Sequence, residues 1–519
     1  MKKSASFTIV TVCILSVITI TGCRSVNPKL QDEYIRPGLS QGMCQVFDKY
    51  RQRIPEIMSE DRVPGLSFAL VDRDGILWAA GFGYTDYDRK TPVTTDTTFL
   101  ICSMSKTITA TAVMIAVQDG LVELDVPIIQ YWPEFTVNSR FEKNPEKKIT
   151  LRHLLNHTSG IAHEAPVGNA REPSYRSLEE HVMSVSDTWL RHKVGARHSY
   201  SGFGYDLVAY ILQRQSGQPF AKYLEDKVFV PLSMSKCSVD AESIRNDPNR
   251  AIGHMPFVKQ IPLAVDVPWV GAGSVYANAK GLARFVQFFL NGGKADGKTI
   301  LDQRLITNMM IPSKRSKNYG LGIEILHING HHALGHWGRG LGFLSGMYWL
   351  PEYEFGIVSL VNSEDVKQSL SGLVTDLIDE NLFKKNESFE IPSGEYQAYQ
   401  PIDPNTFTPF KPEWKKYIGT YKYIMGSAWK LDSSARIALA LGLTTSTTHV
   451  KVFEEGGYLY VDSKVFHDND GGRLDEYLPG LFFTPTGKCL DLRGPKLTWQ
   501  NYRIKKVDND SDRKFDLNR

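Results

Sequence analysis

Strand-forming segments lie at both ends of residues 63–361, and helix-forming segments fill the interval between them. Residues 65–71 and 76–80 have strand patterns, and Asp74-Gly75 between them is a turn signal, so the pattern predicts a hairpin. The other predicted elements are helices at 107–119, 151–157 and 205–217 and strands at 319–323 and 356–361. This segregation favours an α+β domain over a parallel βαβ array. We expect an antiparallel sheet flanked by helices, with a helical subdomain inserted between its strands.

A second domain is predicted after a proline-punctuated, polar linker at 386–410. Short strand patterns separated by turns follow it at 417–421, 449–453, 458–461 and 497–504. Strands of this length and spacing predict a small antiparallel β-barrel or sandwich over residues 411–507. We expect residues 508–519 to be a frayed, charged tail.

The N-terminus has the pattern of an export signal. Lys2 and Lys3 precede the uncharged, largely apolar run 7–20, which has 14 residues where a bilayer-spanning helix needs about 20. Ile20-Thr21-Gly22-Cys23 resembles a bacterial lipobox, which implies lipidation of Cys23 after removal of residues 1–22. An ordinary signal peptide with a chance cysteine is the alternative. The pattern predicts a protein of the cell envelope, lipid-anchored on the periplasmic side or in the outer membrane, with residues 23–45 as a tether.

The chemistry of the chain is indicated by Ser-x-x-Lys, a spacing that puts a hydroxyl and an amine on one face of a helix. The pattern occurs four times, starting at Ser103, Ser233, Ser427 and Ser511. Only Ser103-Met104-Ser105-Lys106 leads directly into a long apolar helical segment, 107–117. The N-terminus of such a helix favours developing negative charge. We therefore predict Ser103 as a nucleophile.

The region 46–385 resembles the serine β-lactamase-related family, which includes class C β-lactamases, D-alanyl-D-alanine carboxypeptidases and esterases. The motifs that carry the resemblance are, in the order of the family, Phe99–Lys106, Leu151–Gly160 with its HLLxHTSG-like stretch, Tyr200-Ser201-Gly202 at the Tyr-x-Asn position, and Gly335-His336-Trp337-Gly338 at the Lys/His-x-Gly strand. A strand ending near Asn362 closes the region. The resemblance implies a catalytic domain that acts on a small-molecule or peptide substrate.

The resemblance also implies a role for each residue. Ser103 becomes acylated, and Lys106 and Tyr200 act together as the base, with the lysine charge favouring a tyrosinate. The backbone amides of Ser103 and Arg339 form the oxyanion hole. His336 lies beside Tyr200 and the substrate.

Two departures from the family pattern affect the predicted substrate. Gly202 replaces an asparagine that helps grip the acyl-side amide of β-lactams and peptides. Trp337, next to Gly338, fills a position usually held by a small residue and should narrow or reshape the cleft. We therefore expect an esterase or a D-amino-acid-type peptidase rather than an efficient β-lactamase. A penicillin- or peptide-binding lipoprotein that does not turn over is the alternative.

No cofactor, metal or nucleic acid is predicted. His327, His331, His332 and His336 lie close in sequence, but Asn329-Gly330 is a hairpin signal that separates them onto different strand faces. The formal charge is +3, and removal of residues 1–22 leaves +1, which does not favour nucleic acid. Of the six cysteines, Cys13 lies in the predicted signal peptide and Cys23 is the predicted lipidation site. The other four, Cys44, Cys102, Cys237 and Cys489, form neither a CxxC pair nor a disulfide framework. Protein partners are not indicated.

Overall fold

The computed structural model describes residues 29–507 except 89, 170–171, 173–175, 256–257, 368–369, 387–388, 391–393, 400–401, 425–429, 432–448, 466–467 and 470–471. The predicted lipidation site Cys23 and two of the Ser-x-x-Lys serines, Ser427 and Ser511, lie outside the described residues. In the part of the chain that is described, no helix combines the length and the hydropathy needed to cross a bilayer.

The catalytic domain is built on a seven-stranded sheet in which every neighbouring pair is antiparallel, with the order β1-β3-β2-β12-β11-β10-β9. Its strands are β1 (Leu30–Ile35), β2 (Gly65–Asp72), β3 (Gly75–Gly83), β9 (Glu324–Ile328), β10 (His331–Gly340), β11 (Phe343–Leu350) and β12 (Phe355–Val361). The predicted hairpin is thus formed by β2 and β3. Strands from both ends of the domain meet in one sheet, where β2 pairs with β12.

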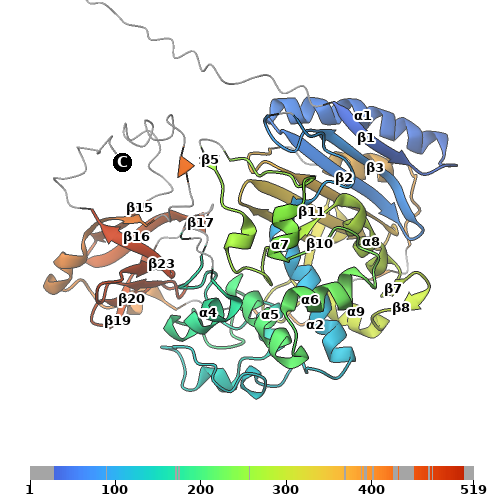
Figure 1. The fold of residues 1–519 in the computed structure, drawn as a ribbon. Coiled ribbons are helices and arrows are strands. Elements are labelled where there is room, and N and C mark those ends of the chain that lie inside the picture. The colour runs from blue at the N-terminus through green and yellow to red at the C-terminus, as the bar shows by residue number, and fades with distance from the viewer. Residues whose placement is uncertain are drawn as a thin grey trace, which may run out of the picture.

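Helices cover both faces of this sheet (Figure 1). The helices are α1 (Gln41–Glu60), α2 (Ser105–Gln118), α3 (Leu151–Leu155), α4 (Leu178–Met183), α5 (Phe203–Ser216), α6 (Phe220–Leu224), α7 (Ala241–Asn246), α8 (Ala279–Leu290), α9 (Gln303–Met310) and α10 (Ser371–Asp379). On one face, α1 and α10 share a core with Phe68 and Leu70 of β2, and on the other face α2 and α8 share a core with Ala69 and Val71. Successive residues of β2 are therefore buried in opposite directions, and the α+β prediction is confirmed.

Three boundaries differ from the sequence prediction. Residues 23–45 are not all tether, because β1 pairs with β3 and α1 begins at Gln41. Polar side chains are tolerated in β1 because it is an edge strand, and Pro28 and Pro37 flank it rather than interrupt it. The predicted strand 319–323 is not a strand, because Gly322 has φ of +71° and β9 starts only at Glu324. Helix α3 ends at Leu155 rather than at His157, which has φ of 59°.

Short strands from the middle of the chain complete the catalytic domain. They are β4 (Phe99–Leu100), β5 (Val258–Gln260), β6 (Tyr276–Ala277), β7 (Lys294–Ala295) and β8 (Lys298–Thr299). The pairing of β4 with β6 fixes the position of the segment that immediately precedes Ser103. The β5 strand pairs with β14 (Lys430–Leu431) of the C-terminal domain, so the two domains share a short ladder.

The C-terminal domain is a ten-stranded antiparallel sheet, as the sequence predicts. Its strands are β13 (Gly419–Tyr423), β15 (His449–Glu455), β16 (Tyr458–Val465), β17 (Asp468–Asn469), β18 (Gly472–Arg473), β19 (Asp475–Leu478), β20 (Leu481–Phe483), β21 (Cys489–Asp491), β22 (Thr498–Trp499) and β23 (Tyr502–Lys506). The sheet nearly closes into a barrel, since β18 pairs with β16, and Leu474 N, just before the opposite edge strand β19, donates to Leu459 O at 2.7 Å. The predicted strand 497–504 is two strands, because the chain reverses at Gln500 and Asn501.

Candidate active site

Ser103 and Lys106 lie together at the start of α2. Ser103 is in the 3₁₀ turn Cys102–Met104, and Lys106 is in the first turn of the helix. The Lys106 ammonium is 2% exposed and donates to Ser103 Oγ at 3.1 Å and to Ala272 O at 2.8 Å. Cys102, just before the nucleophile, has φ of 49°, a conformation that costs a non-glycine residue free energy and persists only where surrounding contacts fix it. The Ser103 hydroxyl and the Lys106 amine are therefore held in contact.

Burial gives Lys106 the properties of a base. Removal from water lowers the pKa of its ammonium from 10.5 to about 8, although the negative charges of Asp206 and Glu164 oppose the shift. A lysine with this pKa has an appreciable neutral fraction near neutral pH, and a neutral amine 3.1 Å from a hydroxyl can accept its proton.

Tyr200 lies on the other side of this pair. Its ring centre is 5.0 Å from Lys106 Nζ, and its hydroxyl is hydrogen-bonded to Ser103. Burial raises the pKa of Tyr200 well above 10, and the hydrogen bond with Ser103 only partly offsets this. The resting tyrosine is therefore a neutral phenol, and the tyrosinate that the family resemblance implies stays a prediction. The geometry allows Lys106 to serve as a base and Tyr200 to serve as a proton donor.

His336 is buried at 1% exposure in β10, with its ring centre 6.3 Å from that of Tyr200. Its Nδ1 is 2.6 Å from Trp337 O, so the proton resides on Nδ1. Its Nε2 then accepts from the Tyr319 hydroxyl at 3.1 Å. Burial, together with the charge of Lys106, lowers the pKa of His336 to about 3. The imidazole is neutral at physiological pH and contacts Tyr319 rather than Ser103.

Besides His163, described below, the sequence prediction misses two residues of this site. Tyr319 donates to His336, and its ring packs 4.7 Å from that of His157. The carboxyl of Glu324 lies 3.7 Å from His336 Nε2, and burial raises its pKa to about 8. A tyrosine in an apolar strand pattern looks like a core residue, and no local motif singles out Glu324.

The strand β10 passes directly beside the nucleophile. A β-carbon at Gly338 would lie 2.8 Å from Ser103 N and would overlap Ile101 O, so only glycine permits this approach. Arg339, whose backbone amide is the second predicted oxyanion donor, is the next residue, and its side chain pairs with Glu364 at 3.7 Å. The alternation of β10 puts Trp337 on the opposite face from His336 and Gly338, and the indole is 46% exposed. The oxyanion hole stays a prediction.

Gly202 is the N-cap of α5, and His163 occupies the space beside it. The Gly202 amide donates to His163 Nδ1 at 3.2 Å, and a β-carbon at residue 202 would lie 3.3 Å from His163 O. Residue 202 therefore lacks the asparagine side chain of the family pattern. The imidazole of His163, which lies beside it, has its ring centre 5.6 Å from that of Tyr200.

The other candidate serines among the described residues do not form such a site. Ser233 has φ of 55° and donates to Asp296 at 3.0 Å. A Gly-x-Ser-x-Gly spacing also occurs at 38–42, but Ser40 caps α1 by accepting from Met43 N at 3.2 Å.

The predicted hairpin turn forms, with Asn329 and Gly330 both at positive φ between β9 and β10. The predicted separation of the histidines is wrong for His327 and His332, which are paired across the two strands and therefore share one face. His327 and His332 face each other at 4.6 Å between ring centres, and His331 Nδ1 is 2.8 Å from the Tyr353 hydroxyl. No cluster of three or more potential metal ligands is present among the described residues.

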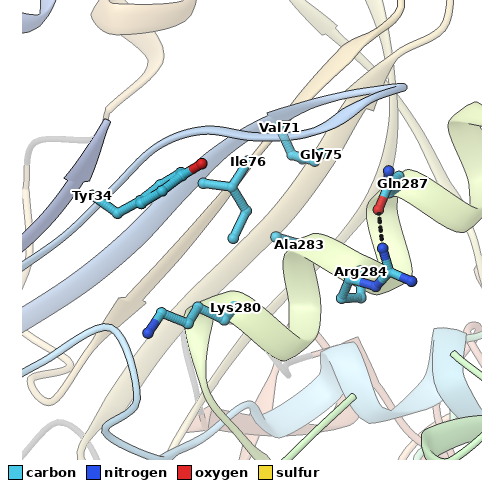
Figure 2. Close-up of a pocket in the computed structure, with 8 residues that line it drawn as sticks. All are labelled: Tyr34, Val71, Gly75, Ile76, Lys280, Ala283, Arg284 and Gln287. Atoms are coloured by element: carbon cyan, nitrogen blue, oxygen red, sulfur yellow. Dashed lines mark hydrogen bonds between the residues drawn. The ribbon is translucent and has the colours of Figure 1, made fainter. Parts of the chain in front are cut away.

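A cavity of about 290 Å³ lies away from Ser103, between the β1–β3 edge of the sheet and α8 (Figure 2). Its cationic lining residues are already paired: Lys280 donates to Asp96 at 2.9 Å, and Arg284 donates to Gln287 at 2.8 Å. These contacts neutralise or occupy the charged groups, so the cavity is not a ready anion site.

The sequence profile of the beta-lactamase family matches residues 50–373, a span that contains Ser103, Lys106, Tyr200 and His336. The chain belongs to the beta-lactamase family. Its catalytic domain has the fold of the serine hydrolases and penicillin-binding proteins of that family. The family assignment explains why the predicted motifs occur in order.

Curated relatives of this beta-lactamase-family chain are distant. Protein flp of Staphylococcus aureus (strain N315) is 25% identical over 340 residues, which cover 63% of this chain and 66% of flp. This chain thus spans slightly less than two thirds of the length of that relative. The putative penicillin-binding protein PbpX of Bacillus subtilis (strain 168) is 27% identical over 293 residues, which cover 55% of this chain and 68% of PbpX.

Solved structures extend the likeness in fold. A penicillin-binding protein homologue from Pyrococcus abyssi, described as octameric, matches with a TM-score of 0.54 and 22% identity over 88% of this chain and 99% of its own. A β-lactamase/D-alanine carboxypeptidase from Yersinia pestis matches with a TM-score of 0.52 and 22% identity over 65% of this chain and 98% of its own. The first match is too extensive for the catalytic domain alone, so it extends into the C-terminal domain.

Proposed function

We propose that this member of the beta-lactamase family hydrolyses esters or amides through an acyl-enzyme on Ser103, with esters or D-amino-acid peptides preferred over β-lactams. The observation that carries the proposal is the 3.1 Å contact between Ser103 Oγ and the buried Lys106 amine, whose pKa is about 8. A serine hydroxyl is a weak nucleophile by itself, and an adjacent base of matched pKa activates it.

The proposed reaction has two stages. Ser103 Oγ bonds to the substrate carbonyl carbon while its proton passes to the neutral Lys106 amine. The tetrahedral intermediate, with its oxyanion held by the backbone amides of Ser103 and Arg339, then expels the alcohol or amine, which takes the proton back through Lys106 or Tyr200. A water molecule then gives a proton to the neutral Lys106 amine and attacks the acyl-enzyme. The second tetrahedral intermediate releases the acid, and Ser103 Oγ takes the proton back from Lys106.

The preference for simple esters rests on Gly202, which has no side-chain amide to hold the acyl-side amide of a peptide or β-lactam. D-amino-acid peptides are included because one neighbour in fold is described as a β-lactamase/D-alanine carboxypeptidase. A site that lacks this hydrogen bond loses more affinity for amide substrates than for simple esters. The same observation favours a second candidate function, a penicillin- or peptide-binding protein that is acylated but does not turn over; PbpX is named a putative penicillin-binding protein.

The test treats wild type and Ser103→Ala with a fluorescent fluorophosphonate and a fluorescent penicillin, and follows the label over time. Labelling that requires Ser103, with rapid turnover of an ester substrate, supports the hydrolase. Penicillin label that persists without turnover of any ester or peptide supports the binding protein. Absence of Ser103-dependent labelling contradicts both.

We also propose that the protein is held at the cell envelope by lipid on Cys23, through the lipobox-like sequence at residues 20–23. Stable anchoring requires two or more acyl chains, which a diacylglyceryl group would supply. Metabolic labelling with a palmitate analogue should mark wild type but not Cys23→Ala, and a variant that stays membrane-bound would contradict the assignment.

A further inference from the structure

The β22–β23 hairpin of the C-terminal domain turns through two residues with left-handed backbones, Gln500 with φ of 51° and Asn501 with φ of 72°. Positive φ at both central residues defines a type I′ turn, for which Asn-Gly is the favoured sequence. Gln500 carries a long side chain in a conformation that favours Asn or Gly. Such a conformation persists only where other contacts fix the residue.

Both side chains of this tip contact the catalytic domain. Asn501 Nδ2 donates to Glu164 O at 2.7 Å and to Thr188 Oγ1 at 3.3 Å. Gln500 Oε1 accepts from Arg191 Nη2 at 2.6 Å. In Figure 1 the C-terminal sheet lies beside the segment that carries α4, at the opposite end of the molecule from α1.

The first of the two contacted loops leads to the residues that follow Tyr200. Glu164 adjoins His163, whose backbone carbonyl accepts from Phe203 N at 2.9 Å and whose Nδ1 accepts from Gly202 N at 3.2 Å. The hydrogen bond from Asn501 therefore fixes the backbone next to the histidine that holds the chain just after Tyr200.

The second loop leads to the residue that precedes Tyr200. Arg191, which donates to Gln500, also donates through Nη1 to Ser199 Oγ at 3.3 Å. The backbone of Arg191 in turn donates to Gly160 O at 2.8 Å, which joins the second loop to the first. Residues 190–202 contain no helix or strand, so tertiary contacts of this kind set the position of Tyr200.

We propose that the tip Gln500–Asn501 is a positioning element for Tyr200, so that the C-terminal domain completes the geometry in which Ser103 is acylated. The inference rests on the proposed function, because it assigns the tip a part in that reaction. The tip acts through Arg191 and the Glu164 backbone and touches neither Ser103 nor Lys106. A misplacement of about 1 Å at a reacting group costs about 100-fold in rate, so loss of two hydrogen bonds that hold its loops has a large effect on acylation.

The test is the double variant Gln500→Asn/Asn501→Gly in the full-length protein. It installs the favoured Asn-Gly turn, shortens the acceptor that reaches Arg191 and removes the donor to Glu164. We expect the hairpin to keep its stability, so the Tm is unchanged or higher. With a fluorophosphonate, kinact should fall by about 10-fold to about 100-fold while KI is unchanged, because the loss is in orientation rather than in binding.

Two further variants separate positioning from general docking. Gln500→Glu keeps an acceptor for Arg191 and should retain the wild-type kinact. Arg503→Ala, on the same hairpin, removes an interface ion pair with Glu172 (2.7 Å) but contacts neither loop residue that leads to Tyr200, and should also label like wild type.

The outcomes are distinguishable. If wild type labels and the double variant labels with the same kinact, the positioning role is refuted and the proposed function stands. An equal loss of kinact in Arg503→Ala overturns it too, since docking in general would then be responsible. A wild-type protein that does not label at all refutes the proposed function and the inference with it. A loss confined to the double variant supports the inference.

Discussion

Acylation of Ser103 should depend on pH through the Lys106 amine. Burial lowers the pKa of Lys106 from 10.5 to about 8. At pH 7 the neutral fraction is then about 10%, against about 0.03% for an unperturbed lysine, so burial increases the amount of competent base roughly 300-fold. Because the amine must be neutral to accept the serine proton, the rate should rise about ten-fold per pH unit below 8 and level off above it.

The assay is the second-order rate of fluorophosphonate labelling, kinact/KI, from about pH 5.5 to about pH 9.5 at constant ionic strength. Wild type should show a single ascending limb with its midpoint near 8. Lys106→Ala should lose the limb and label at least about 100-fold more slowly. No inflection is expected near 6.5, because the pKa of His336 lies near 3. A midpoint near 6.5 would show that a histidine is the base, and a flat wild-type profile would refute the role of Lys106.

Three substitutions test other parts of the site. Gly338→Ala should slow labelling by about 100-fold and cost about 1–3 kcal/mol in thermal unfolding, because its β-carbon would lie 2.8 Å from Ser103 N; labelling like that of wild type would contradict the close packing of β10 on the nucleophile. Gly202→Asn should raise kcat/KM for an ester that carries an acyl-side amide relative to a matched ester that lacks it by up to about ten-fold, the value of one hydrogen bond, and an unchanged ratio would show that the glycine does not set the preference. Asp206→Asn should move the midpoint of the labelling profile below that of wild type, because its negative charge raises the pKa of Lys106; a midpoint that stays or rises would refute that coupling.

The fold was predictable where local chemistry determines it. Asn329-Gly330 supplies the two positive-φ residues of a tight hairpin, and the structure has that turn between β9 and β10. Residues 30–35 were misassigned because edge strands tolerate polar residues that also suit a tether. The pattern of residues 497–504 predicts one strand because Gln500 is an unusual residue for the turn it makes, and its side-chain contact with Arg191 is invisible in the sequence.

The site was predictable to the extent that its residues are close in sequence or carry a family motif. Ser103 and Lys106 are three residues apart on one helix, so their contact follows from helical spacing. Tyr319 and His163 enter the site through contacts between segments distant in sequence, which no local pattern records. The raised pKa of Tyr200, which keeps the phenol neutral, likewise depends on burial by residues from several segments.

The pKa of Lys106 is a balance between burial and the carboxylates of Asp206 and Glu164, and that balance joins the two domains. Asp206 raises the pKa of Lys106, and its Oδ1 also accepts from Ala272 N at 3.0 Å. Because Ala272 O accepts from Lys106 Nζ, one carboxylate both sustains the charge of the amine and holds the carbonyl that orients it. Glu164 is the second of the two carboxylates, and its backbone is held by Asn501. The C-terminal hairpin therefore contacts a residue whose charge tunes the catalytic base, as well as the loops that hold Tyr200.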